Sequence, residues 1–361
     1  MRQWMFGVAA LALVAGTAAA EEGVVHVYNW SDYIDEEILA EFEAETGIKV
    51  VYDVFDSNEL LETKMLAGGS GYDVVVPTGD FLQRQIGAGA FMELDKSKLP
   101  NLVNMWDRIA EVTANYDPGN AYSINYMWGT TGIGYNVDAV EARLGTDEIT
   151  SWDVIFKPEL LEKFADCGVH MLDAPTEMIP AALNYLGHDP DSFDTGQIEE
   201  AAALIQSIRP HIAQFHSSQY IEALANGDIC LAVGWSGDVL QARDRADEAE
   251  NGVRVGYAIP KEGALMWFDQ MAIPSDAPNP EAAHAFLNYI MKPEVIAKAS
   301  NYVYYANGNK ASQALLNEDV IGDPAIYPPE EAVANLYVTS PYPPRVQRTV
   351  TRLWTRIKTG S

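Results

Sequence analysis

Short β-branched runs alternate with helical segments through residues 24–77, and this order constrains the fold more than any other feature of the chain. In the helical segment 35–46, acidic residues occupy the first turn, and Ile38, Leu39 and Phe42 share one face. A strand–helix–strand–helix–strand order predicts an α/β fold with a mostly parallel sheet and helices on both faces. The five segments are 24–28, 35–46, 48–55, 58–67 and 73–77, and the first strand is expected to break at Asn29 into a loop.

The chain of 361 residues is too long for one hydrophobic core. Small residues interrupt a β-rich run at 128–135, beyond which the strand and helix pattern restarts, and a second break near 255–260 leads back. We therefore predict two lobes joined by two crossings. The first lobe comprises 21–130 and about 260–310, and the second comprises 131–259 and part of about 311–361.

The first residues have the pattern of a secretory signal peptide. Arg2 precedes an apolar stretch, 5–14, and small residues end at Ala20, where we expect cleavage. Later segments lack the run of about 20 apolar residues that a membrane span needs. The sequence therefore predicts a soluble protein exported to the periplasm or beyond.

Acidic residues outnumber basic ones by 52 to 23. Loss of Arg2 with the signal peptide would leave 22 − 52 = −30. This net charge argues against nucleic acid and anionic lipid as partners and favours cationic ligands, although an acidic surface also keeps a protein soluble. The basic and apolar segment 348–358 is predicted to be a helix packed on the body.

The two cysteines, Cys167 and Cys230, lie far apart in an exported chain. One structural disulfide is the natural interpretation. Neither cysteine belongs to a Cys-x-x-Cys motif, so the sequence predicts no redox or zinc chemistry. We expect no cofactor.

The sequence lacks the common catalytic signatures. Residues 234–237 imitate a nucleophile elbow but lack the glycine two residues after Ser236. Instead, carboxylates follow indoles in three places, 30–33, 235–238 and 267–269. Sugars stack on indoles, and organic ammonium ions bind both aromatic faces and carboxylates.

Basic residues are missing around several of these acids. Lys and Arg are absent from 21–48, 165–208 and 262–291, so Asp32, Glu177 and Asp269 have no basic neighbour in sequence. Because a buried carboxylate without a partner is costly, such acids are suited to an external cation. A glycoside-active enzyme using two of the acids, and a ligand-loaded sensor that docks on a signalling receptor, remain alternatives.

Several strings of residues, in the same order, resemble the periplasmic polyamine-binding proteins of ABC importers, above all the putrescine and spermidine receptors. The resemblance covers nearly the whole mature chain and implies a two-lobed fold, each lobe a mainly parallel sheet flanked by helices, with a hinge between them. It implies a polyamine ligand, a permease as partner and no catalysis. The strings are 28–33, 46–58, 130–136, 172–175, 216–220, 226–230, 259–264 and 305–307.

The resemblance also implies roles for individual side chains. Trp30, Trp235 and Tyr305 correspond to aromatic walls, and Glu177, Asp238 and Asp269 to ammonium-binding acids. The cystine positions, Cys167 and Cys230, match as well. The full set expected to contact the ligand is Trp30, Ser31, Asp32, Tyr33, Thr78, Asp80, Phe81, Glu177, Trp235, Asp238, Trp267, Asp269 and Tyr305.

Two positions depart from the putrescine receptors, which have Ser where this chain has Asp80 and Phe where it has Trp267. Asp80 could extend the site towards a third amine, or it could cap the helix that follows residue 78. An indole offers a larger face to a cation than a phenyl ring. We therefore expect spermidine to bind at least as well as putrescine.

Overall fold

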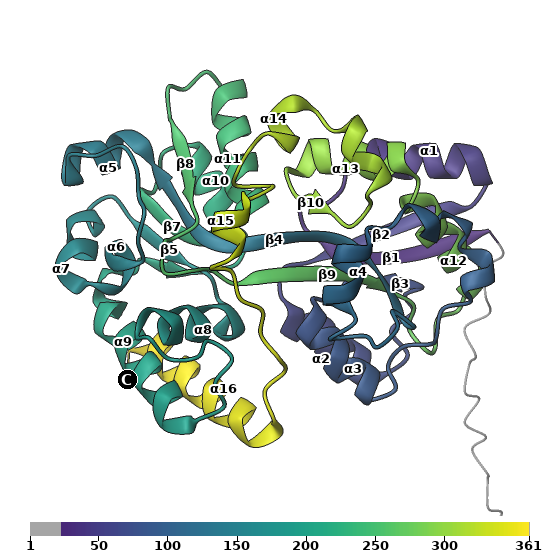
Figure 1. The fold of residues 1–361 in the computed structure, drawn as a ribbon, viewed down its shortest axis with the longest axis horizontal. Helices are drawn as coiled ribbons and strands as arrows, with labels where there is room; N and C mark the ends of the chain where they lie inside the picture. Colours follow the sequence, from purple (N-terminus) through teal and green to yellow (C-terminus); the bar gives the residue numbers. More distant parts are fainter. Residues whose placement is uncertain (1–22, 361) are drawn as a thin grey trace, which may run out of the picture.

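One long strand, β4 (Ser123–Asn136), runs through both halves of the molecule in the computed structural model, which describes residues 23–360. Its first half pairs with β9 (Met266–Ala272), and its second half pairs with β7 (Leu231–Trp235). Figure 1 shows a lobe on either side of this strand. The predicted signal peptide lies outside the described residues.

The first lobe is built on a mixed sheet. Three parallel strands, β2 (Lys49–Phe55), β1 (Val24–Trp30) and β3 (Val74–Val75), are followed by β9 and β4, which run antiparallel to their neighbours. The short strand β10 (Ala306–Asn307) pairs with β4. The helices of this lobe are α1 (Glu36–Thr46), α2 (Asn58–Ala67), α3 (Gly79–Gly87), α4 (Asp107–Thr113), α12 (Pro280–Ile290) and α13 (Pro293–Val303).

The second lobe repeats this plan. Parallel strands β6 (Gln214–Phe215), β5 (Val169–Met171) and β7 lead to the antiparallel β4, and β8 (Val255–Ala258) pairs with β4 as well. Its main helices are α5 (Val137–Leu144), α8 (Pro175–Tyr185), α9 (Thr195–Ile208), α10 (Tyr220–Ala225), α11 (Ser236–Glu248) and α16 (Pro344–Thr359).

Shorter helical turns complete the chain. The short α-helices are α6 (Asp153–Phe156), α7 (Pro158–Leu161), α14 (Glu318–Ile321) and α15 (Glu330–Val333). The 3-10 turns are η1 (Lys96–Lys98), η2 (Pro100–Asn104), η3 (Glu162–Phe164), η4 (Arg209–His211) and η5 (Ala311–Leu315). In residues 23–360, no helix combines the length and the apolar character that crossing a membrane requires.

The predicted α/β architecture is confirmed, with two corrections. The sheets are mixed rather than mainly parallel, because the strands that cross between the lobes run antiparallel to their neighbours. The second crossing also comes later than expected. Because β8 pairs with the second half of β4, the chain returns to the first lobe between Pro260 and Met266.

Each lobe has its own hydrophobic core. One core runs from Val25 to Met127 and from Leu265 to Tyr305, and the other from Ile133 to Ala258 with residues of α16. The domain limits given above stay a prediction. Local residues set the limits of α1: Asp35 caps the helix by accepting from Glu37 N, and Gly47 ends it in the left-handed conformation.

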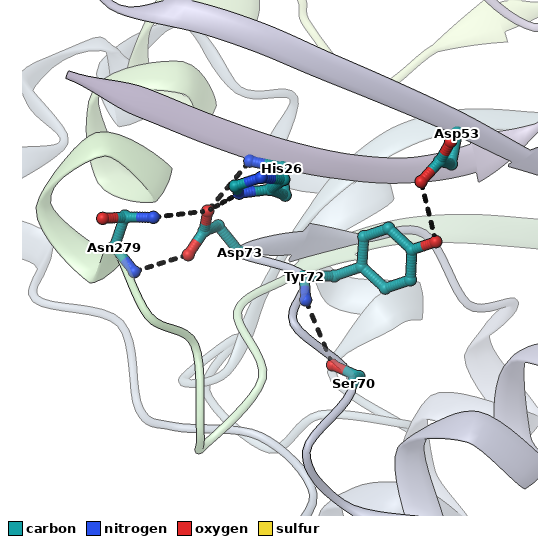
Figure 2. Close-up of polar contacts among 6 residues, drawn as sticks. All are labelled: His26, Asp53, Ser70, Tyr72, Asp73 and Asn279. Atoms are coloured by element: carbon teal, nitrogen blue, oxygen red, sulfur yellow. Dashed lines mark hydrogen bonds and ion pairs between the residues drawn. The ribbon is translucent and has the colours of Figure 1, made fainter. Parts of the chain in front are cut away.

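A buried carboxylate, Asp73, joins β1, β3 and α12 of the first lobe near the starts of these elements. Asp73, just before β3, accepts from the backbone N and the ring Nδ1 of His26 in β1. It also accepts from the backbone N and the side-chain Nδ2 of Asn279, the residue before α12 (Figure 2). Tyr72, the residue before Asp73, donates to Asp53 of β2 (Figure 2).

The predicted disulfide is present. Cys167 and Cys230 are bonded, with their Cα atoms 5.6 Å apart, and they join the segment before β5 to the residue before β7. The bond therefore lies within the second lobe and closes a long loop around its central strands.

Candidate functional site

A narrow cavity lies between the two lobes and contains most of the predicted ligand contacts. It leaves about 30 Å³ for the centres of water-sized groups. One such group needs roughly 10–15 Å³, so the cavity suits a thin, unbranched chain better than a sugar ring. Its lining residues are Trp30, Ser31, Tyr33, Asp56, Asn58, Thr78, Glu177, Ser217, Trp235, Asp238, Trp267, Asp269 and Tyr305.

The fold explains why these side chains meet. Trp30 ends β1, Thr78 follows β3, and Trp235 ends β7, so the carboxyl ends of parallel strands in both lobes face one cleft. Glu177 and Asp238 lie in the first turns of α8 and α11. The positive end of a helix dipole favours a carboxylate at that position.

Asp269, on the crossing strand β9, is the acid of the first lobe. Its Oδ1 accepts from Thr78 Oγ1 at 2.7 Å, and its Oδ2 accepts from the Tyr33 hydroxyl at 2.8 Å. Burial raises the pKa of Asp269 to about 7, although both hydrogen bonds act in the opposite direction. Neutral hydroxyl groups thus hold this carboxylate without neutralising its charge.

Asp238 belongs to the second lobe but is held from both. Tyr220 of the same lobe donates to its Oδ2, and Tyr305 of the first lobe donates to its Oδ1, both at 2.7 Å. Burial raises the pKa of Asp238 to about 7. The bond to Tyr305 crosses the cleft, so the lobes are closed on one another in this structure.

Glu177 is the third buried acid of the cavity. It accepts from Thr131 Oγ1 on β4 and, at 3.4 Å, from the indole Nε1 of Trp235. Burial raises its pKa to about 7. Among the residues that line the cavity, none is Lys, Arg or His, so three buried acids and the partly buried Asp56 face a space without a protein cation.

Aromatic rings form the walls between these acids. Trp30 and Trp235 meet across the cleft edge to face, with ring centroids 5.5 Å apart. Tyr305 contacts Trp267 at 5.3 Å and Tyr33 at 5.1 Å. Aromatic faces attract cations, and their edges enclose an aliphatic chain.

Asp32 and Phe81 are predicted contacts that the structure places outside this cavity. Asp32, with a φ of 55°, pairs with Arg245 of α11 at 2.7 Å, and Gln241 donates to its carbonyl oxygen. The ring of Phe81 is buried, and the guanidinium of Arg84 stacks over it. In this closed form, Asp32 joins the two lobes instead of facing the cavity.

Asp80 lies in a second small compartment, which shares Asn58, Thr78, Glu177 and Trp267 with the cavity. The suggested role as a helix cap is not realised, because the N-cap residue of α3 is Thr78 and Asp80 lies inside the helix. The residue lies in the first turn of α3, and burial raises its pKa to about 7 against the lowering effect of Arg84 and nearby backbone N–H groups. Within residues 23–360, its carboxylate forms no ion pair.

Three lining residues were missed: Asp56, Asn58 and Ser217. Asn58 donates to Thr78 Oγ1 at 2.9 Å, which in turn donates to Asp269. A sequence signal existed for all three, because 46–58 and 216–220 are among the strings that carried the resemblance. Asp56 and Asn58 flank the N-cap Ser57 of α2 and would have been taken for helix-start residues.

Comparison with known proteins identifies the family. The family model described as "Bacterial extracellular solute-binding protein" matches residues 37–328. This chain belongs to the bacterial extracellular solute-binding proteins. It is 52% identical to the putrescine-binding periplasmic protein of Escherichia coli, over 99% of this chain and 98% of that protein.

Two further relatives agree. The chain is 53% identical to a putrescine-binding periplasmic protein of Pseudomonas aeruginosa, over 98% of this chain and 99% of that protein. The solved spermidine/putrescine ABC transporter substrate-binding protein of Streptococcus pneumoniae superposes with a TM-score of 0.76 at 30% identity, covering 94% of this chain and 99% of that one.

Family membership confirms the main predictions made from sequence. The fold is the two-lobed α/β fold of solute-binding proteins, and the chain is a binding protein and not an enzyme. The glycoside-active alternative is therefore excluded. The ligand-binding roles of the individual residues stay a prediction.

Proposed function

We propose that this protein captures a polyamine, putrescine first of all, in the cleft between its lobes and delivers it to an ABC permease from the periplasm. One observation carries the proposal. Glu177, Asp238 and Asp269 are buried around one aromatic-walled cavity whose lining contains no basic residue. A diamine supplies the missing positive charges at both ends of a thin chain.

The magnitudes favour a site led by charge. An ammonium about 4 Å from a carboxylate gains on the order of 4 kcal/mol at intermediate dielectric, before desolvation is subtracted. Burying the four methylenes of putrescine contributes about 3 kcal/mol. The acids therefore select amines and their spacing, while the aromatic walls exclude water and select an unbranched chain.

The relatives support the same ligand, compartment and partner. The two proteins that are 52% and 53% identical are both named as putrescine-binding and periplasmic. The solved homologue at 30% identity is named as part of a spermidine/putrescine ABC transporter. The signal peptide predicted from the sequence agrees with export.

Calorimetry on the mature chain tests the ligand. We expect putrescine to bind, glucose and other neutral sugars not to bind, and cadaverine to bind more weakly because its amines are farther apart. A ligand at 100 times its dissociation constant should add about 2.7 kcal/mol to the free energy of unfolding. Absence of heat and of thermal stabilisation with every amine would refute the proposal.

Lobe closure is part of the proposed mechanism. In Figure 1, β4, β9 and the segment before α16 run between the lobes, which suits a hinge. We expect the ligand-free protein to open and putrescine to shift it to the closed form described above. Small-angle scattering should then show a smaller radius of gyration with ligand, and an unchanged radius at saturation contradicts the closure.

Spermidine is a second candidate because of the compartment at Asp80. Its space of about 10 Å³ for the centre of a water-sized group matches one ammonium. Asp80→Asn should then weaken spermidine binding more than putrescine binding, and Trp267→Phe should shift the preference towards putrescine. Equal losses for both amines in Asp80→Asn would leave Asp80 with a helix-start role alone.

A further inference from the structure

Positive charge is concentrated in one part of this acidic chain. Residues 332–361 contain no Asp or Glu, although the whole chain has 52 acidic residues and a net charge of −29. The same segment contains Arg345, Arg348, Arg352, Arg356 and Lys358. The negative net charge of the whole chain therefore conceals a basic C-terminal segment.

The helix α16 arranges these arginines in a line. Spacings of three, four and four residues place Arg345, Arg348, Arg352 and Arg356 on one face, and all four are exposed. The opposite side packs into the core of the second lobe through Val346, Val350, Leu353, Trp354 and Ile357. We call the four exposed side chains the arginine stripe. Figure 1 shows α16 on the outside of that lobe, beside α8 and α9.

The stripe lacks the ion pairs that most other arginines in residues 23–360 form. Within residues 23–360, none of its four side chains forms an ion pair or a side-chain hydrogen bond. Lys358 is different, because it pairs with Asp173. Five of the seven arginines outside the stripe in residues 23–360 pair with carboxylates, at Glu62, Asp166, Asp323, Asp32 and Asp138, whereas Arg108 and Arg209 form no ion pair.

We propose that the arginine stripe docks the protein on a membrane surface rich in anionic phospholipid. Its four residues span roughly 17 Å along the helix at about 1.5 Å per residue. These side chains form an exposed row along a helix face, with a hollow beside Arg352 and Arg356 only. An extended row of this kind suits a plane of headgroups better than a peptide that needs a groove or a strand edge along its whole length. The planar guanidinium binds phosphate through two parallel hydrogen bonds, which lysine cannot do.

The large negative charge of the rest of the molecule does not prevent this docking. At physiological ionic strength, charges more than about 8 Å apart are largely screened, so a headgroup in contact with α16 experiences mainly the stripe. Two acids lie beside α16: Glu199 of α9 lines a hollow with Arg352 and Arg356, and Asp173 pairs with Lys358. Docking would keep the protein close to a membrane-embedded partner while leaving the cleft free.

Vesicle flotation tests the proposal. The mature protein is mixed with vesicles of phosphatidylglycerol and phosphatidylcholine, or of phosphatidylcholine alone, at 50, 150 and 300 mM NaCl. We expect binding to the anionic vesicles that weakens as salt rises, and none to the neutral ones. Each arginine near an anionic surface contributes roughly fivefold in partition. The variant R345Q/R348Q/R352Q/R356Q should therefore lose binding several hundredfold.

A charge-matched control separates the stripe from net charge. K49Q/K163Q/K261Q/K310Q removes four exposed lysines that lie away from α16, and it should retain vesicle binding. Glutamine has nearly the helix propensity of arginine, so α16 should persist, and both variants should bind putrescine as the wild type does. Should the quadruple arginine variant unfold, R348Q and R352Q singly should each weaken binding about fivefold.

Two results would overturn the docking surface. One is failure of the wild-type protein to bind anionic vesicles at 50 mM NaCl. This would also be the result if the stripe binds an acidic protein instead of a membrane. The other is equal vesicle binding by the stripe variant and the lysine control. Neither result bears on polyamine capture, which calorimetry measures independently.

Discussion

Two sets of buried carboxylates in this protein differ in the groups that hold them. Asp73 and Asp117 are fully buried in the first lobe and accept mainly from N–H groups. The donors to Asp117 are the backbone N of Ala121, Tyr122 and Ser123, together with the Ser123 hydroxyl. Asp238 and Asp269, in the cleft, accept from hydroxyl groups of tyrosine and threonine.

The difference indicates which acids serve the fold and which serve a ligand. An N–H group can only donate, so several of them fix a carboxylate in its charged form and position. A hydroxyl both donates and accepts, and its proton rotates to suit its neighbour. The cleft acids are therefore oriented by partners that tolerate a change of protonation state, and their charge is left for a cation.

The largest expected effect is on ligand affinity. Asp269→Asn and Asp238→Asn should each weaken putrescine binding by about 2–5 kcal/mol, or roughly thirty- to several thousandfold, because an ammonium loses its buried counter-charge. Stability should be retained, because the hydroxyl partners can rotate to accept from the new amide. Calorimetry measures the first quantity and urea unfolding the second.

Asp56→Asn is the matched control for these variants. Asp56 lines the same cavity but is only partly buried, so its loss should change affinity far less. If Asp56→Asn weakened binding as much as Asp269→Asn, burial and hydroxyl partners would not distinguish ligand acids.

For Asp73→Asn we expect a loss of stability without a loss of putrescine affinity. Its amide group must face an N–H of His26 or Asn279 that cannot turn into an acceptor (Figure 2). Unsatisfied buried donors should lower the free energy of unfolding by about 1–3 kcal/mol, while putrescine affinity of the folded protein stays unchanged. Asp53→Asn, which changes the exposed partner of Tyr72, should stay within about 0.5 kcal/mol.

The pKa values of about 7 for Glu177, Asp238 and Asp269 predict a pH-dependent affinity. Below pH 7 these acids bind protons, and an ammonium needs the ionised form. Affinity for putrescine should therefore fall about tenfold per pH unit for each acid that must ionise. Calorimetry in two buffers of different ionisation enthalpy should detect proton release at pH 6.5, and pH-independent affinity between 5.5 and 8 would contradict the shifts.

The stability of the ligand-free protein should fall as pH rises, whereas the affinity for putrescine should increase. In the folded state the pKa of each cleft acid is raised above its ordinary value, so between about pH 4 and 7 the folded protein binds more protons than the unfolded chain. The contribution of these acids to the free energy of unfolding therefore falls as pH rises through that window. Adding putrescine at pH 8 should restore the free energy of unfolding.

Much of the fold could be predicted because its signals are local. Residues close together in the sequence determine the cap Asp35, the stop Gly47 and the apolar faces of α1 and α12. The sheet type was harder to predict, because pairing of β9 with β3 and β4 joins residues that are 136 to 197 positions apart. Periodicity identifies a strand but does not state its direction.

The site was predicted in part for the same reason. Trp235 and Asp238 lie three residues apart on a strand end and a helix start, so their proximity is local. The hydroxyl partners Tyr33, Tyr220 and Tyr305 come from distant segments, and nothing in the sequence assigns them to particular acids. The placement of Asp32 depended on Arg245, more than 200 residues away, which reasoning from sequence neighbours could not include.

The smallest effect concerns this last pair and tests whether Asp32 acts on the ligand or on closure. The side chains of Asp32 and Arg245 are each 36% exposed, so solvent screens their ion pair, which should contribute about 0.2–1 kcal/mol. If the pair acts by favouring the closed form, Asp32→Asn, Arg245→Gln and the double variant should all weaken putrescine binding by the same small factor, at most about fivefold. If Asp32 contacts an ammonium, Asp32→Asn should instead weaken binding far more than Arg245→Gln does. A double-mutant cycle by calorimetry at 50 and 300 mM NaCl separates the two cases, because only the exposed pair should lose its coupling at high salt.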